Sequence, residues 1–145
     1  MKKAIRVRRV SAQAELQKAF AIRRRVFVRE QGVPEEIEMD RDDKRAIHLI
    51  AVSGGNPVGT ARVVIRQGGA KIGRMAVLKS YRRTGIGTEL LKRAIVMAKR
   101  RGARKIYLHA QVSAIGFYEA MGFRCVGPIF NEAGMAHRKM SLRWF

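Results

Sequence analysis

Cysteine is almost missing from this chain of 145 residues, since Cys125 is its only one. A single cysteine excludes an internal disulfide and a cysteine-rich metal site, and the three histidines show no metal-ligand spacing, so we expect no metal. The chain also lacks a run of about 18 apolar residues, so we expect no transmembrane helix. Its basic N-terminus is interrupted by Arg6 and Arg8, unlike the apolar stretch of a signal peptide. These absences predict a cytoplasmic protein with no membrane partner.

Acidic residues are also scarce. The chain has 31 lysines and arginines against 11 aspartates and glutamates, a formal net charge of +20. A charge of this size attracts acidic ligands and favours non-specific binding to polyanions. The basic residues are spread along the whole chain, however, and no aromatic residues are interleaved with them as in nucleic-acid-binding motifs. Specific nucleic-acid binding is therefore an alternative rather than the main interpretation.

What the sequence does contain is a regular succession of apolar segments separated by turn residues. Their periodicity predicts strands over 4–10, 46–52, 58–65, 72–78, 105–110, 123–130 and 137–144. It predicts helices over 11–31, from the loop at 82–87 to 102, and over 113–121. Short turns make the second to fourth strands an antiparallel meander, whereas the long helix before 105–110 requires a crossover and a locally parallel strand pair. We therefore predict one α+β domain over residues 1–145, with a mixed sheet and helices on both faces.

The acidic residues are concentrated in one segment, 34–43, which holds six of the 11 carboxylates. We expect this segment to be a long irregular loop, and such loops often carry function. A solvated surface is one interpretation of its charge. The other is recognition of a cationic amine substrate, for which Glu38 and Asp40 are the candidates.

A glycine-rich loop joins the strand at 72–78 to the long helix. The N–H groups of such a loop and the positive end of the helix dipole converge on one point, where a phosphate group binds well. Arg82 and Arg83 precede the glycines and add donors suited to phosphate. Leu90 stands where a dinucleotide-binding fingerprint needs its third glycine, and no Gly-Lys-Ser/Thr ends the loop, so neither common nucleotide motif is present.

Two motifs together resemble those of the GNAT superfamily of N-acetyltransferases. The first is Arg82-x-x-Gly85-x-Gly87 after a strand, and the second is the segment 114–123, Ala-Ile-Gly-Phe-Tyr-Glu-Ala-Met-Gly-Phe. The order of the predicted elements agrees as well, so the resemblance covers nearly the whole chain. It implies acetyl-coenzyme A as the cofactor, with its pyrophosphate on the loop and its pantetheine beside the preceding strand. The cofactor-binding residues that it implies are Met75, Ala76, Val77, Leu78, Arg82, Arg83, Thr84, Gly85, Ile86, Gly87, Thr88, Gln111, Ala114 and Phe117.

The resemblance also implies roles in acetyl transfer. Val77 is expected to donate its N–H to the thioester oxygen, and Tyr118 matches the general acid that protonates the leaving thiolate. Gln111 stands where the family usually has asparagine. An amine with a pKa near ~10.4 is protonated at neutral pH, so a base or a water chain must take its proton. Glu30 and His109 are the candidate bases, and the acidic segment is a further alternative.

We therefore expect an acetyl-CoA-dependent N-acetyltransferase that acts on a primary amine of a small molecule, as a monomer or a homodimer. Two alternatives stay open. The acceptor is a protein lysine or N-terminus in one of them. In the other, a basic RNA- or ribosome-associated module keeps the fold without the chemistry, and it would show salt-dependent RNA binding without acetyl-CoA binding.

Overall fold

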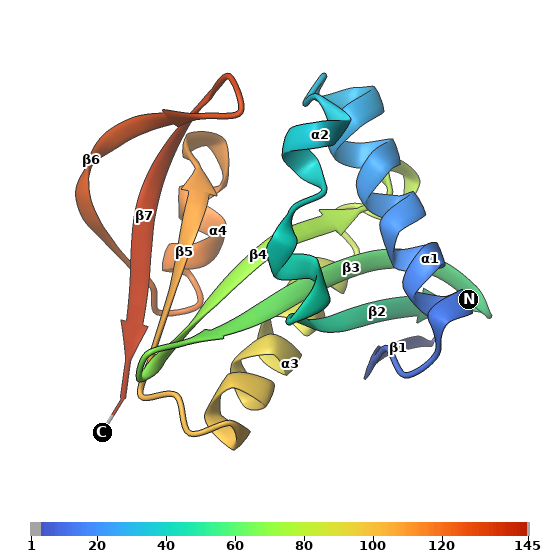
Figure 1. The fold of residues 1–145 in the computed structure, drawn as a ribbon, viewed down its shortest axis with the longest axis horizontal. Helices are drawn as coiled ribbons and strands as arrows, with labels where there is room; N and C mark the ends of the chain where they lie inside the picture. Colours follow the sequence, from blue (N-terminus) through green and yellow to red (C-terminus); the bar gives the residue numbers. More distant parts are fainter. Residues whose placement is uncertain (1–3, 145) are drawn as a thin grey trace.

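The computed structural model describes residues 4–144, which form a seven-stranded sheet with helices on both faces (Figure 1). The strands are β1 (Ile5–Arg9), β2 (Ile47–Ser53), β3 (Asn56–Arg66), β4 (Gly69–Val77), β5 (Lys105–Gln111), β6 (Arg124–Glu132) and β7 (Met135–Arg143). The helices are α1 (Gln13–Arg23), the π-helix η1 (Arg24–Glu30) that continues it, α2 (Glu35–Glu38), α3 (Ile86–Arg100) and α4 (Ile115–Glu119). Short 3₁₀ turns are η2 (Arg41–Lys44), η3 (Lys79–Tyr81) and η4 (Val112–Ala114). All seven predicted strands are present.

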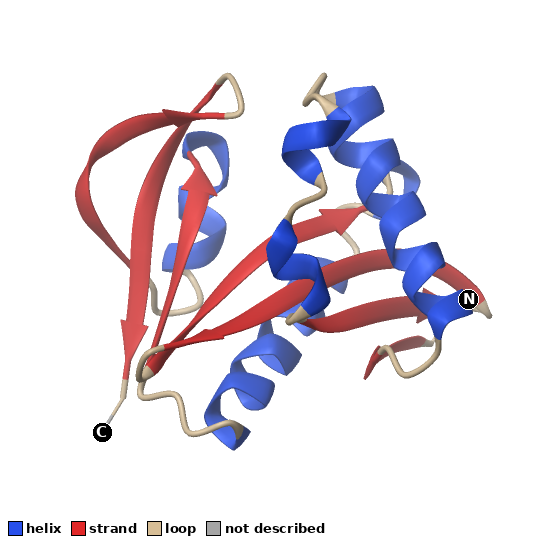
Figure 2. Cartoon of the chain, viewed as in Figure 1, coloured by secondary structure: helices blue, strands red, loops and turns tan. Residues whose placement is uncertain are grey.

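The strand order in the sheet is β1-β2-β3-β4-β5-β7-β6. All neighbouring pairs are antiparallel except β4 and β5, which are parallel and are joined by the crossover through α3. Figure 2 shows that the sheet opens at this central pair into two halves, one with β1–β4 and one with β5–β7. The predicted α+β class, the meander and the parallel crossover are confirmed.

The two faces of the sheet bury different helices. On β2, His48 faces α1 and contacts Phe20 edge to face at 5.6 Å between ring centroids. Its neighbour Leu49 faces the other way and packs in the main core, which also contains Leu90 and Leu91 of α3. Burying one such leucine contributes about 1.5–3 kcal/mol to stability. The alternation of side chains along a strand thus supplies a separate apolar surface to each helix layer.

The helix α3 is 15 residues long and amphipathic. Its buried side chains recur three or four residues apart, as at Leu90, Ala94 and Ala98, so they form one stripe against the sheet. Gly102 follows its end with a φ of 82°, a left-handed conformation that glycine adopts without strain. None of the helices between residues 4 and 144 is both long and apolar enough to span a membrane.

Candidate active site

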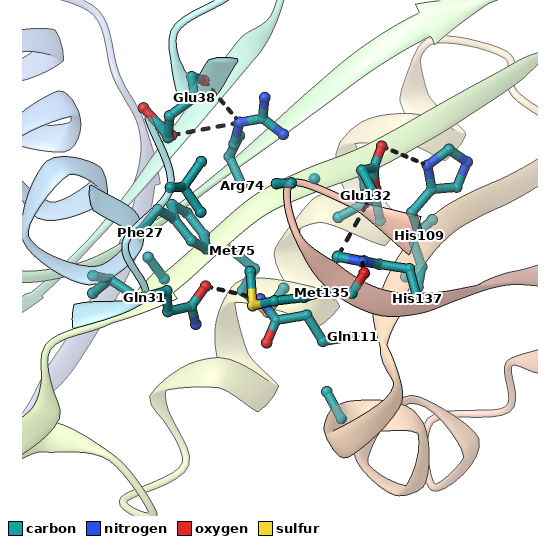
Figure 3. A pocket seen from close by; sticks show the side chains of 18 of the residues that line it. Phe27, Gln31, Glu38, Arg74, Met75, His109, Gln111, Glu132, Met135 and His137 are labelled. Atoms are coloured by element: carbon teal, nitrogen blue, oxygen red, sulfur yellow. Dashed lines mark hydrogen bonds and ion pairs between the residues drawn. The ribbon is translucent and has the colours of Figure 1, made fainter. Parts of the chain in front are cut away.

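A cavity of about 650 Å³ lies where β4 and β5 separate. The two strands pair only through Ala70 with Ile106 and Lys71 with Tyr107. Beyond these pairs, the ends of both strands form opposite walls of a cleft, and side chains from both halves of the sheet point into it (Figure 3). The cleft therefore offers unpaired strand backbone and side chains to the same ligand.

A β-bulge in β4 accompanies this separation. The register of β3 and β4 shifts between Thr60 and Arg62, so that Arg74 and Met75 of β4 together oppose a single residue of β3. Arg74 has a left-handed φ of 50°, which costs a non-glycine residue on the order of 1 kcal/mol. A bulge bends its strand and increases its twist, and here it turns the end of β4 away from β5.

The backbone N–H of Val77 points into the cleft. Leu78 donates its own N–H to the carbonyl of Val58 at 2.9 Å, and Val77 lies opposite Gly59. Because N–H groups alternate in direction along an antiparallel strand, the N–H of Val77 points away from β3 and toward β5. Val77 also lines the cavity, and its role as a donor to a ligand there stays a prediction.

Leu78 is an exception among the expected cofactor contacts on β4. Its N–H is bonded to β3, and its side chain packs against a buried cluster of Ile22, Val26 and Ala76. It does not line the cavity, whereas Met75 and Ala76 do. The sheet hydrogen bonds thus continue one residue past the end of β4, and a cofactor contact of Leu78 stays a prediction.

The loop before α3 exposes backbone N–H groups. Arg83 and Gly85 have positive φ angles of 62° and 88°, and α3 begins directly afterwards at Ile86. The Thr84 hydroxyl donates to the carbonyl of Tyr81, which holds the loop in its turn. No side chain of the described residues caps the first turn of α3, so its N–H groups are available to an anion. This arrangement fits a pyrophosphate, and Ile86 contributes only backbone because its side chain is buried.

Gly87 lies beneath the ring of Phe117. A Cβ atom at Gly87 would stand 3.5 Å from the Cζ atom of Phe117, an ordinary van der Waals contact, so the start of α3 lies directly against this ring of α4. Phe117 packs on the start of α3 and does not line the cavity, whereas Ala114 does. Thr88 follows Gly87 in the first turn of α3.

Arg82 and Glu30 form an ion pair with each other. The Arg82 Nη2 atom lies 3.0 Å and 2.9 Å from the two carboxylate oxygens of Glu30. Its Nε atom donates to the carbonyl of Val77 at 2.9 Å. Glu30 does not line the cavity, and its carboxylate faces a guanidinium rather than an incoming amine. The structure therefore does not support Glu30 as the base, and it gives Arg82 partners that compete with a phosphate.

His109 on β5 lines the cavity and contacts a carboxylate that the sequence did not single out. Its Nδ1 atom lies 3.2 Å from Glu132 on the β6–β7 hairpin, and Glu132 also lies 3.9 Å from the Nε2 atom of His137 (Figure 3). Burial lowers the pKa of His109 and the charge of Lys71 lowers it further, although Glu132 raises it. The imidazole is therefore neutral at pH 7. With the proton assigned to Nδ1 beside the carboxylate, the Nε2 lone pair is left to accept a proton.

Tyr118 lines the same cavity from α4. Its ring packs edge-on against Phe117 and Phe123, with centroids 5.1 Å and 5.9 Å away. Burial raises the pKa of Tyr118 to about 12, so the hydroxyl stays protonated at neutral pH. It is therefore available as a proton donor, as the sequence predicts.

Gln111 at the end of β5 reaches across the cleft to η1. Its Nε2 atom donates to the side-chain oxygen of Gln31 at 2.9 Å. Both glutamines line the cavity, and the bond connects the end of β5 with the residue that follows η1. Gln31 was not predicted, because nothing in the sequence relates it to a residue 80 positions later.

The acidic segment is ordered and paired with arginines, so the expectation of an irregular loop was wrong. It forms α2 and the turn η2, which lie over the sheet beside α1 (Figure 1). Glu38 is only 2% exposed, and Arg23 donates to its Oε1 atom at 2.7 Å. Arg62 donates to both carboxylate oxygens of Asp40, at 2.6 Å and 2.9 Å. A solvated surface therefore does not describe Glu38, whereas the side chain of Asp40 stays 35% exposed.

Both acidic residues predicted to bind substrate do line the cavity. Arg74 lies between them, donating to the backbone carbonyl of Glu38 at 3.0 Å and to Asp40 at 3.2 Å. The Oε2 atom of Glu38 lacks a partner among the described residues, but that oxygen is itself buried. The carboxylates thus neutralise arginines inside the protein, and a direct contact with substrate stays a prediction.

Comparison with known proteins assigns the chain to a class. Residues 9–144 match the family model of the acetyltransferase (GNAT) domain. The uncharacterized N-acetyltransferase YjcF of Bacillus subtilis is 37% identical over 127 residues, which cover 87% of this chain and 91% of YjcF. The chain therefore belongs to the GNAT family of acetyltransferases, which use acetyl-CoA as the acetyl donor.

Solved structures give the same architecture. An acyl-CoA N-acyltransferase from Pseudomonas aeruginosa matches with a TM-score of 0.83 and 27% identity, over 96% of this chain and 98% of that protein. The PaiA N-acetyltransferase from Thermoplasma acidophilum, solved in complex with coenzyme A, has the same fold, with a TM-score of 0.76 and 18% identity. That match covers 97% of this chain and 99% of the PaiA chain. The family and the cofactor expected from the sequence are confirmed.

Proposed function

We propose that this protein transfers an acetyl group to a primary amine of a small molecule. The observation that carries the proposal is that Val77, His109 and Tyr118 all line one cavity, although they come from β4, β5 and α4. A hydrogen-bond donor, a proton acceptor and a proton donor are the groups that amide formation from a thioester needs. A cavity of about 650 Å³ is also of the size that encloses a small ligand.

The donor side of the cavity is assigned to the backbone. Acetyl-CoA supplies an acetyl group activated as a thioester. The N–H groups from Arg83 to Thr88 and the side chain of Arg83 would hold its pyrophosphate, and Met75 to Val77 would lie along its pantetheine. The N–H of Val77 would donate to the thioester oxygen, where negative charge grows during attack.

The two proton transfers of the reaction are assigned to side chains. An alkyl amine is mostly protonated at pH 7 and must lose a proton before it attacks, and the Nε2 atom of His109 accepts that proton, directly or through a water. Tyr118 gives its hydroxyl proton to the leaving sulfur. Glu132 keeps the imidazole oriented through its contact with Nδ1.

The experiment is a panel of small primary amines with acetyl-CoA, read by release of the coenzyme A thiol and by the mass of the acetylated amine. We expect at least one amine to raise thiol release well above hydrolysis in its absence. Acetyl-CoA alone should also raise the melting temperature, because it binds only the native state. Binding of acetyl-CoA with acetylation of a protein lysine or N-terminus, and of no small amine, would contradict the proposal.

A further inference from the structure

Lys71 differs from the other charged side chains that line the cavity, because it has no ion-pair partner. The carboxylates are each engaged, Glu38 by Arg23, and Asp40 by Arg62. Glu132 contacts His109, Arg74 contacts Asp40, and Arg82 contacts Glu30. Within residues 4–144, no carboxylate lies within ion-pairing distance of the Lys71 ammonium. Among the cations of the described residues that line the cavity, Lys71 is therefore the one available to pair with an anionic ligand.

Lys71 also lies beside the proposed base. It is in register with Tyr107 on the adjacent strand, and His109 follows Tyr107 by two positions. Residues two apart on a strand share a face, so Lys71 and His109 lie on the same face of the sheet, and both line the cavity. The charge of Lys71 acts on His109, lowering its pKa together with the larger effect of burial.

A half-buried ammonium without a counter-ion is unfavourable, and an anion in the cavity would supply the missing charge. We propose that the acceptor is a small amine that also carries a carboxylate, which Lys71 binds while the amine approaches His109. This inference rests on the proposed function and names the class of its substrate. It replaces the expectation, drawn from the acidic segment, that the acceptor is recognised through its positive charge.

The charges around Lys71 agree with this assignment. Burial lowers the pKa of Lys71, and the positive charges of Arg62, Arg74 and Arg66 lower it further, whereas Glu132 raises it. Three guanidinium groups therefore act on this ammonium against one carboxylate, and they disfavour a second ammonium on the acceptor beside Lys71.

The test uses pairs of acceptors that differ only in the carboxylate, such as glycine with glycinamide and β-alanine with β-alaninamide. Thiol release from acetyl-CoA gives kcat/KM for each member. We expect the carboxylate to be preferred in the native protein, although the amine of the amide is less basic and would otherwise react faster. Lys71→Met should lower the ratio of the two kcat/KM values by at least about tenfold, the worth of a hydrogen bond to a charged group.

Two further variants control this result. Lys71→Arg keeps the charge and should retain the preference. Lys139→Met removes an exposed lysine that stacks on Tyr107 at 4.9 Å and does not line the cavity, and it should leave the ratio unchanged. Amides that react as well as acids, or a ratio that Lys71→Met does not change, would overturn the inference alone. Turnover of other small amines but of neither member of any pair would also overturn the inference alone, whereas acetyl-CoA binding without turnover of any small amine would overturn the proposed function with it.

Discussion

At the scale of single residues, the phenol of Tyr118 is suited to one direction of proton transfer. Its raised pKa, caused by burial, keeps the hydroxyl protonated over the whole working range. A hydroxyl with this pKa is a weaker acid than a simple thiol, whose pKa is about 8.5, so it keeps its proton in a hydrogen bond to the sulfur until the C–S bond breaks. The same burial holds the ring between Phe117 and Phe123.

Replacing Tyr118 by phenylalanine should lower kcat by about 10²-fold, the usual contribution of one general acid. The dissociation constant of acetyl-CoA should not change, because the ring keeps its packing. Steady-state thiol release and calorimetric titration measure the two quantities. Tyr107→Phe is the matched control, since Tyr107 lies outside the cavity lining, and it should keep kcat. An unchanged kcat in Tyr118→Phe would remove this hydroxyl from catalysis.

The pH dependence should report on His109. Burial and Lys71 place its pKa below the ordinary 6.5, although Glu132 raises it, and only the neutral ring accepts a proton. We therefore expect an acidic limb in the pH profile of kcat/KM, with activity lost as the pH falls through a value below 6.5. Glu132→Gln should move this limb to lower pH, because the stabilising carboxylate charge is gone. If the acidic limb of the kcat/KM profile persists in His109→Gln, it reports the titration of another group and contradicts the role of His109 as the base.

The sequence revealed the residues of this site unevenly. Tyr118 stands in a motif with a fixed distance to the glycine loop, so its position could be predicted. Glu132 and Gln31 have no such context, because each is brought to the cavity by strand or helix pairing with residues far away in the chain. Lys71 looks like any solvent-facing residue of an alternating strand. Only the structure shows that Lys71 lacks a carboxylate partner while the other charged side chains of the cavity are paired.

At the scale of elements, the bulge in β4 decides where the cavity lies. Gly73 within an apolar strand is a common sequence sign of a bulge, yet the left-handed φ falls on Arg74 beside it. A strand pattern predicts which residues are buried, but it does not predict where the register shifts. The strand was therefore predictable, and its divergence from β5 was not.

The loop before α3 should be sensitive to substitution at Gly85. Gly85→Val forces a β-branched residue to a φ of 88°, and we expect it to weaken acetyl-CoA binding at least about tenfold by distorting the N–H groups. Gly55→Val is the control, because Gly55 has a φ of 84° in the β2–β3 turn and equally open surroundings. Both variants should lose about 1–2 kcal/mol of stability in denaturant unfolding. Equal acetyl-CoA affinities in calorimetry would contradict a role for this loop.

At the scale of the whole molecule, the scarce carboxylates are concentrated where they neutralise buried arginines. Arg23 lies on the apolar face of α1, and Arg62 lies inside an otherwise apolar strand, and both are nearly inaccessible. Such buried cations require partners, and this requirement could have predicted that the acidic segment packs on the sheet. The apolar periodicity of the sequence does not show this packing, because each arginine and its carboxylate lie 15 to 22 positions apart in the chain.

The free energy of unfolding should therefore depend on pH through the ion pairs between the acidic segment and these arginines. Burial alone would raise the pKa of Asp40, but the hydrogen bond and charge of Arg62, with the charge of Arg74, lower it from 3.8 to about 2. The folded pKa is lower than the unfolded one, so the stabilisation is fully present above about pH 4 and is lost as the pH falls through 2. Asp40→Asn should unfold more easily at pH 7 and show a weaker pH dependence between 4 and 2.

Denaturant unfolding at several pH values measures this effect. The control is Asp42→Asn, which breaks the more exposed pair with Arg66 and should cost less than about 1 kcal/mol. Equal losses in both variants, with the same pH dependence, would contradict a special role for Asp40. In Asp40→Asn, the side-chain oxygen of the asparagine still accepts a hydrogen bond from the backbone N–H of Asp42, so the start of η2 is preserved.

The β6–β7 hairpin has a consequence for how such an enzyme diversifies. Its tip contributes Glu132, Ala133 and Met135 to the cavity wall, while Arg74 and Met75 of β4 lie on the opposite side of the cavity (Figure 3). A surface hairpin tolerates changes of length and composition better than a core element does. Exchanging this turn between relatives would therefore redirect the enzyme to new acceptors while its donor-binding half is inherited intact.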